Sequence, residues 1–204
     1  MLRVGLTGGI ACGKSTVGEM LVRRGAHLLR ADNLAHDLYA PGTPTYEEVV
    51  RHFGRSILNE DETINRAKLA NAVFPTRIGE LNAIVHPAVV AAQNRWMDEM
   101  ESEDPTGIAV VEAALLIEAG VARDFERVIV VVCNPEWKAA RYARRTGLGL
   151  EEARAEVERR SAAQLSDAEK AGHAHYVIDN SGAVERTEQV VEKVWKELQG
   201  LAKG

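Results

Sequence analysis

The feature that most constrains this chain is a glycine-rich segment close to its amino terminus. Residues 8–15, Gly-Gly-Ile-Ala-Cys-Gly-Lys-Ser, fit the pattern G-x-x-x-x-G-K-[ST]. The segment follows a short apolar run at residues 4–6 and precedes residues 14–24, whose apolar side chains have the spacing of one helix face. Glycines let the backbone curl until successive N–H groups face one phosphate, and the following helix adds the positive end of its dipole. The pattern therefore predicts a phosphate-binding loop between a strand and a helix, called the phosphate loop below.

Each position of this loop has a predicted part in binding ATP. Lys14 reaches the β- and γ-phosphates, the Ser15 hydroxyl is a ligand for Mg²⁺, and Thr16 is placed for the α-phosphate. The backbone of the remaining positions would cradle the phosphates, and these are Gly8, Gly9, Ile10, Ala11, Cys12 and Gly13. The plain alternative is a glycine-rich turn that carries a lysine by chance.

Apolar runs and helical patterns alternate along much of the chain. Strand candidates lie at residues 26–29, 108–111, 128–133 and 176–178, in addition to residues 4–6. Continuous β-branched runs such as residues 128–133 suit parallel strands that helices cover on both faces. The alternation predicts an α/β fold of the P-loop NTPase type, in which a parallel five-stranded sheet lies between two helical layers.

Two helical segments interrupt this alternation. Residues 41–104 contain helical stretches at 46–53, 66–74 and 78–100, and Pro87 is expected to open a new segment within the last of them. Residues 135–170 are helical and rich in arginine and glutamate. We interpret the first segment as a helical substrate-binding insertion and the second as a helical lid. Residues 1–40, 105–134 and 171–204 would then form the nucleotide-binding core.

Composition excludes several classes of protein. The formal net charge is -5, so no overall basic field is available to hold a nucleic-acid backbone. No apolar run approaches the roughly 20 residues of a membrane span, and the glycine turn comes too early for a signal peptide. Two cysteines, Cys12 and Cys133, form neither a disulfide framework nor a metal cluster. These features predict a cytoplasmic protein that exists as a monomer or a small homo-oligomer.

Two carboxylates follow predicted strands, at the sheet edge where open α/β proteins bind ligands. Asp32 could accept the proton of an attacking hydroxyl, or it could cap the helix that follows. Glu112 could hold Mg²⁺ through water, or it could be an ordinary polar residue at a strand end. The sequence leaves both pairs of alternatives open.

The cationic and apolar side chains near the same sheet edge also allow both a functional and a purely structural interpretation. Arg141 and Arg145 are four residues apart, so one helical face could present both to a transferring phosphate. A solvated face paired with nearby acids is the other interpretation of these arginines. Leu115 and Leu116 could form a pocket wall or part of the core. Cys12 could be a reactive thiol or a small residue that fits the loop, and Cys133 suits the core.

The ordered set of motifs resembles the dephospho-CoA kinase family over nearly the whole chain. The family's opening, L-T-G-G-I-G-S-G-K-S-T-V, is similar to residues 6–17, and its D-A-D-x-x-A-[RH] is similar to residues 30–36. The further matches are Pro41-Gly42, residues 52–54, Asn65-Arg66, Val73-Phe74, residues 84–87, residues 110–118, Arg141, Arg145, Gln164, Lys170 and residues 177–180.

The resemblance implies an enzyme that transfers the γ-phosphate of ATP to the ribose 3′-hydroxyl of dephospho-CoA, the last step of coenzyme A synthesis. It implies that Asp32 is the catalytic base, that Lys14, Arg141 and Arg145 stabilise the transferring phosphate, and that Asn180 lies near adenine. The residues implied to line or support the acceptor site are His36, His86, Leu115 and Leu116.

This chain departs from the family pattern at several positions. Ala11 and Cys12 replace Gly-Ser in the loop, where backbone N–H groups make most of the contacts. Arg30 replaces the first aspartate of D-A-D, Ala114 the proline of P-L-L, and Lys138 a common glutamine. None of these changes removes a group that the expected chemistry requires.

Two other functions compete with this interpretation. A kinase for a nucleoside or nucleotide would share the loop, the lid and a helical acceptor domain. A nucleotide-dependent switch would have no acceptor, but a GTP switch normally carries an N-K-x-D motif, and Asn180 is followed by Ser181-Gly182.

Overall fold

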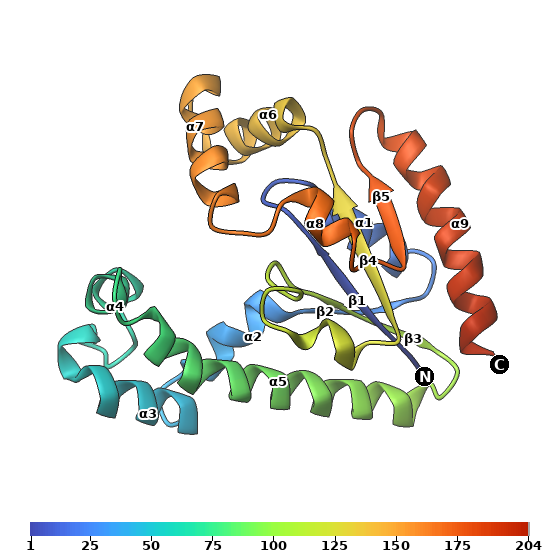
Figure 1. Ribbon diagram of the computed structural model, residues 1–204. Helices are drawn as coiled ribbons and strands as arrows, with labels where there is room; N and C mark the ends of the chain where they lie inside the picture. Colours follow the sequence, from blue (N-terminus) through green and yellow to red (C-terminus); the bar gives the residue numbers. More distant parts are fainter. Residues whose placement is uncertain (204) are drawn as a thin grey trace. The chain divides into compact units, whose positions relative to one another are not determined.

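The computed structural model describes residues 1–203, apart from the side chains of Ala35 and His36 (Figure 1). The chain forms two compact units. The first unit comprises the residues up to Leu29 and those from Met97 onward, and the second comprises Arg30–Trp96. Each unit has its own apolar core and is described by itself.

One sheet organises the first unit. Its strands are β1 (Leu2–Gly8), β2 (His27–Arg30), β3 (Ile108–Glu112), β4 (Arg127–Val132) and β5 (Tyr176–Asp179), and they lie in the order β2-β3-β1-β4-β5. The pairs β1–β3, β1–β4 and β4–β5 are parallel. Val4 in β1 lies opposite Val110 on one side and Arg127 on the other. The carboxyl end of β1, where the phosphate loop starts, therefore has the ends of β3 and β4 on either side.

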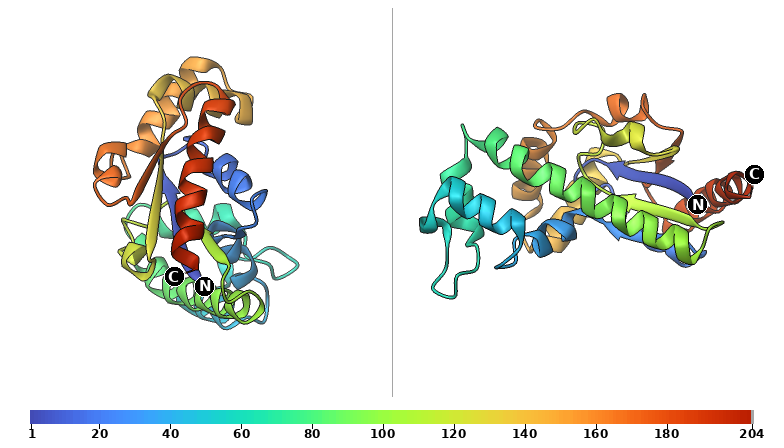
Figure 2. Two further views of the ribbon diagram at one scale, coloured as in Figure 1. Left: turned by 90° about the vertical axis from the view of Figure 1, so that its right-hand side faces the viewer. Right: turned by 90° about the horizontal axis from the view of Figure 1, so that it is seen from below.

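Helices cover the sheet because the central strands are apolar on both faces. The helices of this unit are α1 (Lys14–Val22), α6 (Pro135–Thr146), α7 (Leu150–Ser161), α8 (Asp167–Ala171), α9 (Val184–Ala202) and the end of α5 (Ile78–Glu103), with a short 3-10 turn η2 (Val121–Asp124). α1 and α9 pack against each other and against one face of the sheet (Figure 2). Their core includes Val4, Leu6, Val17, Leu21, Val110, Ile129, Val131, Val191 and Leu198. The other face contacts α8 and the segment after β3, where Leu116 and Phe125 lie against Gly5.

The predicted α/β sheet is confirmed, including all five strands. The predicted three-layer arrangement follows from the same burial pattern, since β1, β3 and β4 are buried almost throughout. Residues 135–170 form three helices, as their composition indicated. Among residues 1–203, no helix combines the length and the apolar character that crossing a membrane requires.

The second unit is helical. It contains α2 (Ala31–Leu38), α3 (Pro44–Phe53), a 3-10 turn η1 (Arg55–Ile57), α4 (Arg66–Val73) and most of α5. Thr43 caps α3 by accepting a 3.2 Å hydrogen bond from the Tyr46 N–H, with proline next to the cap, and Asn65 caps α4. The core of the second unit consists of Tyr46, Val49, Phe53, Ile57, Leu58, Leu69 and Val73.

In this unit one local expectation is wrong, and one of the alternatives left open for Asp32 is not borne out. Pro87 does not open a new segment, because α5 continues through it as one helix of 26 residues. Asp32 is not the N-cap of its helix, because α2 starts at Ala31, directly after β2, and Asp32 lies within the first turn. A carboxylate there still favours the helix, since it faces the positive end of the dipole.

Candidate functional site

The phosphate loop links the end of β1 to the start of α1. Gly13 precedes α1 with a left-handed backbone, φ 92° and ψ 31°, and no side chain caps the helix. No acidic residue lies in its first turn. The N–H groups that begin a helix need acceptors, and here no side chain of the helix start supplies one. This end of α1 is therefore suited to an anion.

The Lys14 ammonium lies across the loop. Its Nζ donates to the Gly8 carbonyl at 3.0 Å and to the Gly9 carbonyl at 3.2 Å. The two contacts place the positive charge beside the residues that open the loop. A bound phosphate would find this charge already in position, which lowers the cost of reorganisation.

Asn180 holds the other end of the loop. Its Nδ2 donates to the Cys12 carbonyl at 2.9 Å, its Oδ1 accepts from the Thr187 hydroxyl at 3.0 Å, and the residue is 2% exposed. A Cβ at Gly13 would lie 2.1 Å from the same Nδ2. Glycine is required at position 13 by this close approach and by its positive φ.

Arg141 reaches the loop from α6. Its guanidinium donates to the Cys12 carbonyl at 3.2 Å and to the Asn180 carbonyl at 2.8 Å. The same group lies over the Trp137 ring, 5.5 Å from the ring centroid. The hydrogen bonds and the cation–π contact fix a cation beside the phosphate loop.

An oxygen pair lies where the first turn of α1 meets the end of β3. The Ser15 hydroxyl donates to Glu112 Oε1 at 2.8 Å, and Glu112 is 7% exposed. Hydroxyl and carboxylate oxygens are the ligands that Mg²⁺ prefers. The donor set therefore fits a magnesium ion held with nucleotide phosphates.

Helices α6 and α7 pack on the loop from another side. Tyr142, Ala153 and Val157 form a small core that also contacts Ile10 and Ala11. A cavity of about 570 Å³ lies between the loop and α6, α7 and α8, and Gly9, Lys138, Gln164 and Asp167 are among the residues that line it.

The segment after β3 is held by a buried lysine of α8. Lys170 is 0% exposed, forms a 2.8 Å ion pair with Glu118 and donates to the Ala114 carbonyl at 3.1 Å. Partial burial acts to raise the pKa of Glu118, but hydrogen bonds from Lys170 and from the Leu165 N–H outweigh it and hold that pKa below its usual value. Of the two leucines in this segment, Leu115 is exposed and Leu116 is buried in the core.

The two cysteines are buried. Burial raises the pKa of both the Cys12 and the Cys133 thiols, although the positive charges of Lys14 and Arg141 act against it. A raised pKa keeps a thiol protonated and weakly nucleophilic. The geometry therefore favours small residues that fit the loop and the core over reactive thiols.

Comparisons with known proteins show the family of this chain. The family model described as dephospho-CoA kinase matches residues 2–186. A dephospho-CoA kinase of Aquifex aeolicus is 42% identical over 200 residues, which cover 97% of this chain and 98% of that protein. The chain belongs to the dephospho-CoA kinase family. It is therefore a kinase of the final step of coenzyme A synthesis.

Solved structures have the same architecture as this dephospho-CoA kinase family member. The crystal structure of TT1252 from Thermus thermophilus matches with a TM-score of 0.78 and 32% identity, covering 97% of each chain. The dephospho-CoA kinase from Campylobacter jejuni matches with a TM-score of 0.70 and 26% identity, also covering 97% of each chain.

Among the other predicted residues of this kinase, Arg145 lies on α6, whereas Asp32, His36 and His86 lie in the second unit. The Arg145 guanidinium is exposed and stacks on the Tyr142 ring, 5.1 Å from its centroid. Asp32 and His86 are exposed in α2 and α5 of the second unit, and the predicted His36 side chain is outside what the structure describes.

Sequence reasoning missed three side chains next to the loop. Trp137 supports Arg141, while Lys138 and Asp167 form an ion pair beside Gly9. The only signal was that Lys138 departs from the family's glutamine. Asp167 gave no signal, because its partner is 29 residues away.

Proposed function

We propose that this chain transfers the γ-phosphate of Mg²⁺-bound ATP to the ribose 3′-hydroxyl of dephospho-CoA, giving coenzyme A and ADP. The observation that carries the proposal is the phosphate loop, with Lys14 held across it and Arg141 bonded to its Cys12 carbonyl. Family membership supports the choice of acceptor. A cytoplasmic location is part of the same proposal.

The loop residues bind and orient the nucleotide. Backbone N–H groups of residues 8–13 and of the first turn of α1 would bind the β-phosphate, and Thr16 would contact the α-phosphate. From its place beside the Gly8 and Gly9 carbonyls, Lys14 would reach the β- and γ-phosphate oxygens. Asn180 donates to the Cys12 carbonyl of the loop and would lie near the adenine of the nucleotide.

Ser15 and Glu112 would hold the magnesium ion. Their oxygens already lie together, so Ser15 would bind the ion directly and Glu112 would bind it through water. The ion supplies charge neutralisation on the transferring phosphate when it is bound.

Asp32 would act as the base for the acceptor hydroxyl. The hydroxyl oxygen forms a bond to the γ-phosphorus while the bond from that phosphorus to the bridging oxygen breaks, and the hydroxyl proton passes to the carboxylate. Arg141 and Arg145 would neutralise charge on the transferring phosphate. His36, His86, Leu115 and Leu116 would line or support the acceptor site.

Release of ADP from Mg-ATP tests the proposal, with dephospho-CoA, AMP, adenosine, pantothenate or no acceptor added. Stimulation by dephospho-CoA alone, with a 3′-phosphorylated product identified by mass, is the expected result. Stimulation by AMP or adenosine would favour a nucleotide or nucleoside kinase. Slow hydrolysis that no acceptor changes would favour a nucleotide-dependent switch.

A further inference from the structure

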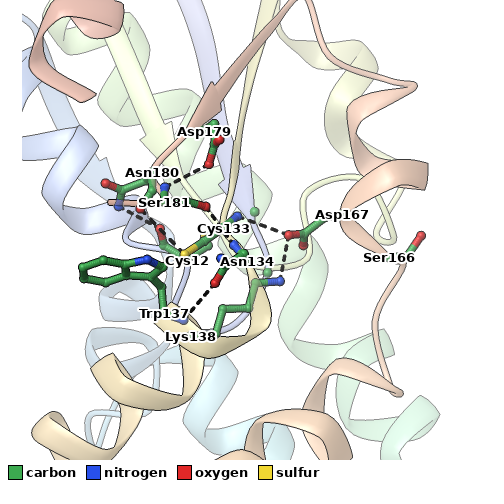
Figure 3. A network of polar contacts seen from close by, with 12 residues as sticks. Cys12, Cys133, Asn134, Trp137, Lys138, Ser166, Asp167, Asp179, Asn180 and Ser181 are labelled. Atoms are coloured by element: carbon green, nitrogen blue, oxygen red, sulfur yellow. Dashed lines mark hydrogen bonds and ion pairs between the residues drawn. The ribbon is translucent and has the colours of Figure 1, made fainter. Parts of the chain in front are cut away.

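Lys138 and Asp167 form a partly buried ion pair at the base of the lid. Lys138 lies in the first turn of α6, and Asp167 is the first residue of α8. Lys138 Nζ and Asp167 Oδ2 are 2.7 Å apart, and the two side chains are 11% and 26% exposed. Figure 3 shows the pair beside the network that joins Cys12, Cys133 and Asn180.

The pair lies against the phosphate loop. A Cβ built on Gly9 would lie 2.9 Å from Asp167 Oδ1 and 3.1 Å from Lys138 Nζ. Asp167 Oδ2 also accepts a 3.3 Å hydrogen bond from the Cys133 N–H, at the end of β4. This ion pair therefore connects four segments: the phosphate loop, the end of β4, the start of α6 and the start of α8.

Stability alone does not account for this pair. The first turn of a helix is the positive end of its dipole, so a lysine there is disfavoured. Burying an ion pair costs solvation of both charges, and apolar residues of similar size are often equally stabilising. What a buried pair supplies instead is a defined geometry.

Gly9 connects this geometry to the lysine of the loop. The Gly9 carbonyl accepts a hydrogen bond from Lys14 Nζ, so the position of the Gly9 peptide helps to set where that ammonium lies. Without a side chain, Gly9 leaves room for the two charged groups to pack directly against its backbone. A shift of Gly9 would shift the carbonyl that holds Lys14.

We propose that the Lys138–Asp167 pair positions the phosphate loop: it fixes the Gly9 peptide and, through it, the Lys14 ammonium. Both are positioning residues, because their contacts are with each other, with the Gly9 backbone and with the Cys133 N–H. The inference rests on the proposed function only in that the loop binds ATP. It does not depend on the identity of the acceptor.

Binding of a non-hydrolysable ATP analogue with Mg²⁺, measured by calorimetry on the full chain without an acceptor, tests the inference. The variants are Lys138→Met, Asp167→Asn and the double variant, and their melting temperatures are recorded beside the affinities. Each single change is expected to weaken binding about tenfold, less than the roughly 100-fold that a 1 Å misplacement can cost a reaction. The double variant should lose little more, because both single changes break the same contact.

Two further variants separate positioning from general stability. Lys138→Arg keeps a charged donor for Asp167, so it should bind the analogue more tightly than Lys138→Met does. Glu151→Gln removes an exposed acid of α7 that pairs with Arg154, and it should leave binding unchanged. In kinetics, KM for ATP should rise in the Lys138→Met variant while KM for dephospho-CoA does not.

Variants with a lower melting temperature but the analogue affinity of the wild type would overturn the inference. The ion pair would then contribute to stability and not to positioning of the loop. A wild-type protein that does not bind the analogue would overturn the proposed function, and this inference with it. A wild-type protein that binds the analogue but does not phosphorylate dephospho-CoA would overturn only the acceptor assignment, and weaker binding in the variants would still support the positioning role.

Discussion

The Ser15 hydroxyl donates a 2.8 Å hydrogen bond to the Glu112 carboxylate, joining the first turn of α1 to the end of β3. Since β1 and β3 are neighbouring parallel strands, the residues that follow one come close to the end of the other. This contact places a magnesium-type oxygen pair next to the phosphate loop.

Glu112→Gln should raise the Mg²⁺ concentration needed for half-maximal activity. The amide keeps the shape but loses the charge that orients Ser15 and the water around the ion, and loss of such an outer ligand costs about tenfold or more in metal affinity. Titration of activity with Mg²⁺ at fixed ATP measures the effect. Glu152→Gln, an exposed change on α7, is the control, and equal Mg²⁺ dependence of both variants would exclude this role for Glu112.

Lys14→Ala should nearly abolish turnover while the fold survives. Lys14 Nζ contacts only two carbonyls of the loop among the hydrogen bonds of the described residues, so little packing is lost. We expect kcat/KM for ATP to fall by at least about 100-fold, the scale of losing one charge aimed at the transferring group. Comparable activity in a variant with the wild-type melting temperature would contradict the assigned role.

Asp32→Asn should lower kcat by roughly 10²–10⁴ if the carboxylate is the general base. Asp37→Asn, an exposed change in the same helix α2, is the matched control. Steady-state kinetics with dephospho-CoA measures both variants. A loss of less than about threefold would leave Asp32 as a favourable charge in the first turn of α2.

Arg141→Met should slow phosphoryl transfer more than it weakens ATP binding. The guanidinium also donates to the Cys12 and Asn180 carbonyls, so some loss of ATP affinity is expected as the loop loosens. We expect kcat to fall about 100-fold or more and KM for ATP to rise no more than about tenfold. Arg144→Met, at the exposed end of α6, is the control. A change confined to ATP affinity would argue against a role in transfer.

The sequence predicted best what depends on residues close together in the chain. The loop pattern at residues 8–15 and the β-branched run of β4 each carry enough local information to define an element. Local information was not sufficient at two positions. Proline at position 87 predicted a helix start, but α5 continues through this residue. For Asp32 the sequence left open an N-cap role, but α2 starts at Ala31, directly after β2.

Contacts between distant residues could not be read from the sequence. Leu115 and Leu116 are equally apolar, yet only the fold turns Leu116 into the core beside Gly5. Asn180 was expected near the nucleotide, but nothing indicated that both atoms of its amide would bond to protein groups. The predicted roles of Asp32, His36 and His86 in the acceptor site stay predictions.

The buried pair of Lys170 and Glu118 should make a measurable contribution to stability, and the two partners should differ. Lys170 has a side chain that is 0% exposed, whereas that of Glu118 is 19% exposed. Glu118→Gln leaves an ammonium without its counter-ion in the interior and should cost about 3 kcal/mol in the free energy of unfolding. Lys170→Met leaves a carboxylate that water partly reaches, and it should cost less.

The pH dependence provides a second measurement of this pair. Because the pKa of Glu118 is lower in the folded protein than its usual value of 4.5, its contribution is fully present above pH 4.5 and is lost as the pH falls through the folded pKa. The difference in unfolding free energy between the wild type and Glu118→Gln should therefore be constant from pH 7 to about pH 5 and shrink below it. Urea unfolding at several pH values measures this difference. A difference that stays the same down to the lowest pH at which both proteins fold would mean that the charge of Glu118 does not stabilise the segment after β3.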